Sequence, residues 1–151
     1  MFHRYDYEAE FYPALSRLPL DLRRKLDLTG IKISLKHWLV YSMEERAVLC
    51  HLPCDNDDEK DVFRCYLDFL SGKYLGRPTE KTAVMSEALW GDSAVPEAVV
   101  ERCRSLHEVV SVEEWRRWPS HHRFALYKTA VSKSQPEAFE QVLRQLRKLV
   151  T

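Results

Sequence analysis

Only four glycines and seven prolines interrupt the 151 residues of this chain. An all-β domain needs turn residues far more often, so such long uninterrupted stretches favour helices joined by short connections. Four of the prolines stand directly before runs of apolar residues at helical spacing, namely Pro19, Pro96, Pro119 and Pro136. Proline suits the first turn of a helix because the N–H that it lacks would have no partner there. The sequence therefore predicts an all-α chain.

Apolar residues at steps of three and four mark the longer helices. These expected helices run over residues 19–28, 57–74, 79–90, 96–106 and 136–150. The helix over 57–74 has an apolar stripe made of Val62, Phe63, Tyr66, Leu67, Leu70 and Tyr74. The helix over 79–90 is less regular, and its expected inward side chains are Val84, Ala88 and Leu89.

Capping residues mark the ends of the shorter helices. Ser34, Ser42 and Ser111 can each accept a hydrogen bond from the first turn of a helix. Glu45 stands three residues after Ser42, so the two form a capping box. Gly30 follows the first helix, where a glycine ends it. We expect seven to nine helices in a single compact domain over the whole chain, joined by short extended links.

Part of the sequence is repeated. Residues 18–49 align with residues 95–126 without a gap when the chain is shifted by 77 positions. The identical pairs are Pro19 and Pro96, Ser34 and Ser111, Trp38 and Trp115, Arg46 and Arg123, and Leu49 and Leu126. Chance matching in a helix-rich sequence is the alternative. An internal duplication would let two units bury apolar faces that one could not bury alone, with a helical insert over 55–92 and a C-terminal helix over 136–150.

The overall charge excludes some classes of protein. The chain has 23 basic and 23 acidic residues, whereas a protein that binds nucleic acid through phosphates should have a basic surplus. No stretch approaches the roughly 20 apolar residues that span a bilayer. The N-terminal residues include acids where a signal peptide would be apolar, so we expect a cytoplasmic protein without a membrane or nucleic-acid partner.

The neutral total hides an uneven distribution of charge. Residues 55–100 contain five basic and ten acidic side chains, whereas residues 101–151 contain ten basic and six acidic ones. Such asymmetry either steers a partner or reflects the solvated faces of different helices. The acidic excess begins at 55–59, where negative charge also favours the N-terminus of a helix.

The matched arginines and tryptophans of the repeat have two interpretations. A guanidinium group offers five donors in a rigid fork, which suits either an anionic ligand or the carbonyl groups at a helix end. Arg46 and Arg123 could thus converge on an anion-binding or sensor pocket, or each could tie together the helices of its own repeat. Trp38 and Trp115 are expected to anchor the core, because large aromatic residues dominate core packing.

No arrangement of residues indicates catalysis. The chain lacks the nucleophile, phosphate-loop and H-E-x-x-H motifs, so we expect no enzyme and no cofactor. None of the four cysteines stands in a C-x-x-C pair. Cys50 and Cys54 would share a helical face if one helix reached both, but Pro53 between them indicates that the helix ends, which leaves them weak candidates for a metal.

Several segments together resemble a known family. The segments are Leu18-Pro19, Leu22-Arg23, Lys25-Leu26-Asp27, Gly30-Ile31-Lys32-Ile33-Ser34, Trp38, Glu45-Arg46 and Leu52-Pro53-Cys54, followed by Val95-Pro96, Trp115 and Arg123-Phe124-Ala125-Leu126. In these segments the chain is similar to the nitrate-reductase-associated protein family, small proteins best known from cyanobacteria. The resemblance covers about residues 8–126.

The resemblance implies a non-catalytic accessory protein of nitrate assimilation, with nitrate reductase as its protein partner. The charged residues of the first motif are candidates for contacts with that partner, namely Arg23, Lys25, Asp27 and Lys32. A solvated helix face is the alternative for Arg23 and Lys25. Residues 127–151 lie outside the resemblance and could form a distinctive partner surface.

Overall fold

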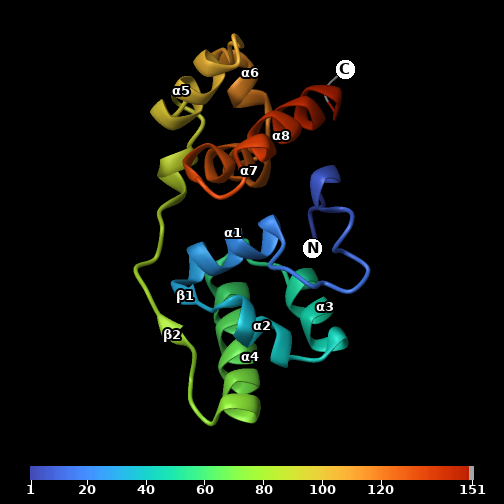
Figure 1. Ribbon diagram of the computed structural model, residues 1–151. Helices are drawn as coiled ribbons and strands as arrows, with labels where there is room; N and C mark the ends of the chain where they lie inside the picture. The colour runs from blue at the N-terminus through green and yellow to red at the C-terminus, as the bar shows by residue number, and fades with distance from the viewer. Residues whose placement is uncertain (150–151) are drawn as a thin grey trace. The chain divides into compact units, whose positions relative to one another are not determined.

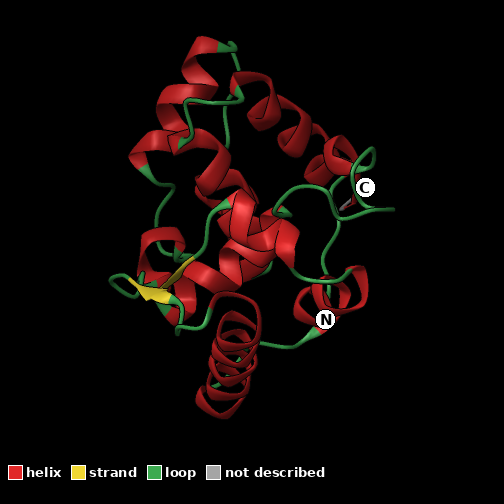
Figure 2. Cartoon of the chain, turned by 60° about the horizontal axis from the view of Figure 1, so that its bottom comes forward, coloured by secondary structure: helices red, strands yellow, loops and turns green. Residues whose placement is uncertain are grey.

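The computed structural model describes residues 1–149, most of which are helical (Figure 1). The α-helices of this range are α1 (Leu20–Thr29), α2 (Leu35–Val40), α3 (Met43–His51), α4 (Asp57–Leu75), α5 (Glu97–Ser105), α6 (Val112–Arg117), α7 (Ser120–Val131) and α8 (Pro136–Leu149). Two short 3-10 helices are η1 (Asp6–Glu8) and η2 (Glu87–Trp90), and the strands β1 (Ile31–Lys32) and β2 (Glu80–Lys81) pair antiparallel. Figure 2 shows this small ladder, in yellow, beside the helices. The prediction of an all-α chain is confirmed.

The backbone contacts divide the chain into two compact units. The first unit contains residues 1–4 and 8–86, which include α1 to α4 and both strands. The second unit contains residues 5–7 and the chain from residue 87 onward, which includes η2 and α5 to α8. Each unit has buried apolar side chains of its own.

The core of the first unit is built around α4, which packs against α1 and α3. The buried face of α4 presents Phe63, Leu67 and Leu70. These side chains form one cluster with Leu15, Leu22, Leu26, Ile31, Ile33, Trp38, Tyr41, Leu49, Cys50 and Cys54. The predicted stripe of α4 is thus correct at its centre and wrong at its edge, because Val62 and Tyr74 are exposed. Val62 directly precedes Phe63 and so lies about 100° from it around the helix axis, whereas Tyr74 lies one turn beyond Leu70, in the last turn of α4.

The core of the second unit is built around α7, which packs against α5, α8 and η2. The helix α8 is strongly amphipathic and buries Ala138, Phe139, Val142, Leu143 and Leu146. Trp90, Trp115, Trp118 and Phe124 are also buried in this unit. Val150, the last residue of the helix expected from the sequence, lies outside the described residues.

The helix predicted over 79–90 is wrong. Its first part forms β2 and then continues without regular structure, and only η2 at its end is helical. The cause is a long-range pairing: Thr82 N donates to Gly30 O (2.8 Å), and Met85 N donates to Asp27 O (2.9 Å). An extended chain is needed to reach these carbonyl groups. Consequently Val84 and Leu89, expected to face inward, are exposed.

Candidate functional site

The elements of the two segments predicted to be repeats begin 77 residues apart. This holds for α1 and α5, for α2 and α6, and for α3 and α7. The serine caps also correspond, since Ser34 accepts a hydrogen bond from His37 N and Ser111 accepts one from Glu114 N. A left-handed residue follows the first helix in both, with φ of 70° at Gly30 and 56° at His107.

In the first unit the matched tryptophan and arginine of the repeat hold the backbone before α1. Trp38 Nε1 donates to Leu15 O (2.7 Å), and Arg46 Nη1 donates to Leu15 O (2.9 Å) and Ala14 O (3.2 Å). Leu15 has a left-handed backbone with φ of 47°, a conformation that costs a leucine of the order of 1 kcal/mol. The two donors fix this strained turn, in which the Leu15 side chain is buried.

The second unit uses the same residue types in the same way. Trp115 Nε1 donates to Gly91 O (2.7 Å), and Arg123 Nε donates to Trp90 O (2.8 Å) while its Nη1 donates to Trp118 O. Arg46 and Arg123 are therefore each occupied by carbonyl groups of their own unit. An anion site would need guanidinium groups free to bind a ligand, so these contacts argue against that interpretation.

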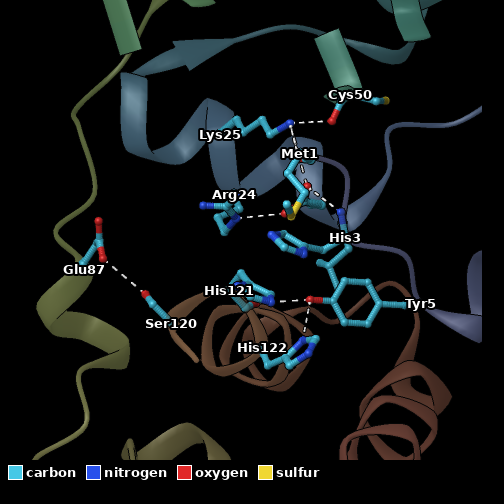
Figure 3. A network of polar contacts seen from close by, with 12 residues as sticks. Met1, His3, Tyr5, Arg24, Lys25, Cys50, Glu87, Ser120, His121 and His122 are labelled. Carbon is cyan, nitrogen blue, oxygen red and sulfur yellow. Dashed lines mark hydrogen bonds and ion pairs between the residues drawn. The ribbon is translucent and has the colours of Figure 1, made fainter. Parts of the chain in front are cut away.

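A buried charged centre lies beside α1 of the first unit (Figure 3). Lys25 is fully buried, and its Nζ donates to Met1 O (3.1 Å) and Leu49 O (3.4 Å), and also to Cys50 O. Asp21 lies 3.8 Å from Lys25 Nζ and accepts a hydrogen bond from Arg24 Nε (2.9 Å). Burial lowers the pKa of Lys25, and the Asp21 carboxylate opposes this shift. The ammonium group thus binds the last carbonyl groups of α3, where a cation is favoured.

This geometry corrects the hypothesis that Lys25 contacts a partner, because a buried side chain cannot do so. Arg24 is buried as well, so the basic run of α1 is not a surface patch. Arg23 and Asp27 are half-buried, and Lys32 is exposed beside its strand partner Glu80. Pro19 and Pro96 stand directly before α1 and α5, one residue ahead of the first helical turn in which they are expected, and Gly30 stands directly after α1.

Glu8 is a buried group that the sequence does not reveal. Its carboxylate accepts hydrogen bonds from Leu20 N (2.9 Å to Oε2, 3.2 Å to Oε1) and from the Tyr12 hydroxyl group (2.6 Å). Pro19 makes no side-chain cap, so Glu8 serves as the cap of α1 from twelve residues away. Burial raises the pKa of Glu8 to about 7 from its ordinary value of 4.5. Neither spacing nor motif indicates such a distant cap.

The positions of the cysteines do not favour a metal site. The helix α3 ends at His51 and the chain continues extended at Leu52, so Cys50 and Cys54 do not share a helical face. Burial raises the pKa of the Cys50 thiol to about 12 and also raises that of Cys54, which disfavours the thiolate that binds metals. Within residues 1–149, no three His, Cys, Asp or Glu side chains are placed to hold a metal ion.

Each unit has a hollow on its surface. In the first unit a hollow of about 270 Å³ lies between the end of α3 and the first turns of α4, lined by Leu52, Pro53, Asp58, Glu59 and Val62. In the second unit a hollow of about 230 Å³ is lined by Val95, Val100, Cys103, Arg104, Glu108, Val109 and Val110. Of these lining residues only Cys103 carries a thiol, and burial together with the nearby Glu108 raises its pKa, which disfavours the nucleophilic thiolate. Open surfaces that combine apolar and charged side chains are suited to contact with another molecule.

Comparison with known proteins identifies one family. Residues 4–146 match the family described as "Conserved nitrate reductase-associated protein". Neither the curated proteins nor the solved structures include a significant match to this chain. Among residues 1–149, none of the helices is both long enough and apolar enough to cross a membrane.

Proposed function

The chain belongs to the nitrate reductase-associated family, and from this premise we propose that it is a non-catalytic accessory protein of nitrate reductase. It acts by direct protein contact and supports either the activity of the reductase or its assembly, including the loading of the molybdenum cofactor. The observation that carries this proposal is the match of one family over residues 4–146, nearly the whole chain.

The use of the buried and half-buried polar groups supports an accessory role over catalysis. Arg46, Arg123 and Lys25 all donate to backbone carbonyl groups of their own unit. Glu8 accepts from a backbone N–H. Groups committed to the backbone in this way stabilise the fold and are not available to a substrate. The chain itself needs no cofactor in this role, and we place it in the cytoplasm with the reductase.

We also infer that residues 18–49 and 95–126 are copies of one ancestral unit. The common 77-residue spacing of their helices, their serine caps and their left-handed residues supports this inference. A crystal structure provides the test. If the backbones of the two segments superpose only at single helices, the duplication is wrong.

Deletion of the gene tests the accessory role. In cells grown on nitrate, we expect loss of the protein to lower reductase activity and the wild-type gene to restore it. Measuring the molybdenum content of the purified reductase separates the two versions of the proposal. A low content indicates a role in cofactor loading, whereas a normal content with low activity indicates support of the mature enzyme. Full activity together with full molybdenum content in the deletion strain would contradict the proposal.

A further inference from the structure

The outer side of α4 in the first unit exposes large apolar side chains in one row. Val62 and Phe69 are 56% and 63% exposed, and they lie seven residues apart, which is two helical turns and therefore the same face. A helix that met only solvent on this side would present polar residues there. These exposures indicate a face that another surface covers.

The row lies along α4 beside α3, which runs antiparallel to it. At one end Glu45 of α3 binds Lys73 (2.9 Å) and Tyr74 of α4 (2.6 Å). At the other end the last residues of α3 and the first turns of α4 line the hollow of about 270 Å³. Val48 is 43% exposed and precedes Leu52 of this hollow by one turn of α3, so it adds an apolar residue to the α3 side.

The charged residues that line this hollow are both acidic. Asp58 and Glu59 line the hollow together with the apolar Leu52, Pro53 and Val62. Within the described chain no ion pair involves Asp57, Asp58 or Glu59; the nearby ion pair uses Asp61, with Arg64 (3.0 Å). The helix dipole accounts for acids in the first turn of α4, but it does not account for the apolar residues beside them.

We propose that the hollow lined by Leu52, Pro53, Asp58, Glu59 and Val62, together with the exposed Val48 and Phe69, forms one docking surface, called the α3–α4 groove, which binds a basic amphipathic helix of a partner protein. A helix is the occupant because two helices that pack side by side leave a groove into which the ridge of a third helix fits. Lysine or arginine flanks its apolar anchors, because their long stems cover apolar surface while their charged ends reach carboxylates such as Asp58 and Glu59. This inference deepens the proposed function and rests on it for the identity of the partner, nitrate reductase.

A second copy of this chain is a less suitable occupant. Its basic amphipathic helix is α8, and the apolar face of α8 is already buried in the second unit. The occupant therefore has to come from a different protein, and self-association becomes an outcome that the experiment must report.

The test uses the full chain, purified nitrate reductase and two designed peptides. The peptides are 18-residue amphipathic helices, one of leucine and lysine and the other of leucine and glutamate. The groove variant is V62S combined with F69S, and the charge variant is D58N combined with E59Q. The control is V109S in the second unit, where Val109 is 78% exposed. Circular dichroism confirms that each variant folds.

We expect the groove variant to weaken binding of the reductase and of the leucine–lysine peptide at least tenfold, with V109S unchanged. The charge variant should weaken both about threefold at low salt and less at high salt, because exposed charges are screened. Amide NMR shifts caused by the leucine–lysine peptide should cluster around Leu52, Val62 and Phe69. The leucine–glutamate peptide should not bind.

The outcomes distinguish failure of the groove assignment from failure of the proposed function. If the reductase binds the groove variant as tightly as the wild type, the groove assignment is overturned while the proposed function stands. If the reductase binds neither protein but the leucine–lysine peptide maps to the groove, the assignment of the groove stands and the proposed function fails. If sedimentation shows a dimer that the groove variant dissociates, a second copy occupies the groove and the assignment to a different protein is overturned.

Discussion

The two units hold the link after their first helix by different means. In the first unit the link is β1, and the backbone of a second segment pairs with it, with Ile31 opposite Lys81 and Lys32 opposite Glu80. In the second unit a side chain replaces that backbone. Arg147 of α8 donates to Val109 O (2.6 Å), to Glu108 (2.8 Å) and to Glu114 (2.9 Å).

This difference explains why the equivalent left-handed positions carry different residues. A Cβ atom at Gly30 would lie 2.7 Å from Thr82 O and 2.9 Å from a methyl group of Val84. A pairing strand needs such close approach, so only glycine fits beside it. Arg147 reaches the link of the second unit with a long side chain. His107 is consequently accommodated at the same backbone conformation and is exposed.

The largest expected effect comes from adding a methyl group at the strand contact. Gly30→Ala should lower the free energy of unfolding by about 3 kcal/mol, because left-handed strain adds to the clash with the backbone. Chemical denaturation followed by circular dichroism measures this loss. A cost below about 1 kcal/mol would show that β2 moves away easily and that the comparison of the two links is wrong.

The cap of α1 gives the next largest effect, and it depends on pH. The pKa of Glu8 is raised to about 7 in the folded chain from an ordinary 4.5, so the folded state binds more protons between these values. Stability should therefore fall as pH rises from about 4.5 to 7, by about 3 kcal/mol, and stay level above pH 7.

The variant Glu8→Gln keeps an oxygen acceptor for Leu20 N and cannot ionise. It should remove this pH dependence from denaturation curves recorded between pH 4.5 and 8. The helix α5 also begins after a proline without a side-chain cap, and the second unit shows no equivalent of the Glu8 contact at that position within the described residues. A pH dependence that persists in Glu8→Gln assigns the titration to another group.

The arginine clamp of the second unit should contribute less than the strand of the first. Arg147→Met removes the donors to Val109 O and to two carboxylates, which should cost about 1 to 2 kcal/mol because these groups remain partly solvated. The matched control is Arg144→Met on the same helix, whose ion pair with Glu140 is exposed and should change stability by less than about 0.5 kcal/mol. Equal losses in the two variants would mean that Arg147 does not hold the link.

The smallest expected effect has the opposite sign. His107→Gly relieves left-handed strain but increases the flexibility of the unfolded chain, so it should stabilise the protein by about 0.5 kcal/mol. Thermal unfolding of His107→Gly and of Gly30→Ala under the same conditions measures the effect of a substitution at each of the two left-handed positions. Destabilisation by His107→Gly would indicate that the imidazole ring contributes contacts of its own.

Local signals in the sequence are sufficient to place most helices. Ser42 and Glu45 lie three residues apart, so both members of the capping box are visible in one short segment, and the structure contains both hydrogen bonds. Gly30 likewise ends α1 through the carbonyl group of Leu26, four residues earlier. Signals of this kind act within one turn of helix and need no knowledge of the fold.

The features that sequence reasoning missed depend on distant partners. The extended path of residues 80–85 depends on carbonyl groups of Asp27 and Gly30, more than fifty residues away. Lys25 is buried because α3 presents its carbonyl groups to it. The same holds for the α3–α4 groove, since periodicity assigns Val62 to an apolar stripe but does not show which apolar residues the fold leaves uncovered.

The distribution of cysteines provides separate reporters for the two units. Cys50 and Cys54 are buried in the first unit and Cys103 is buried in the second, whereas Cys65 is exposed. A thiol reagent should therefore modify Cys65 at once and the others only when their unit opens. The rates at which the reagent modifies Cys50 and Cys103, followed by mass spectrometry of peptides, would give the opening equilibrium of each unit in the same unaltered molecule. The natural chain thus allows the two halves to be compared kinetically without any engineered probe.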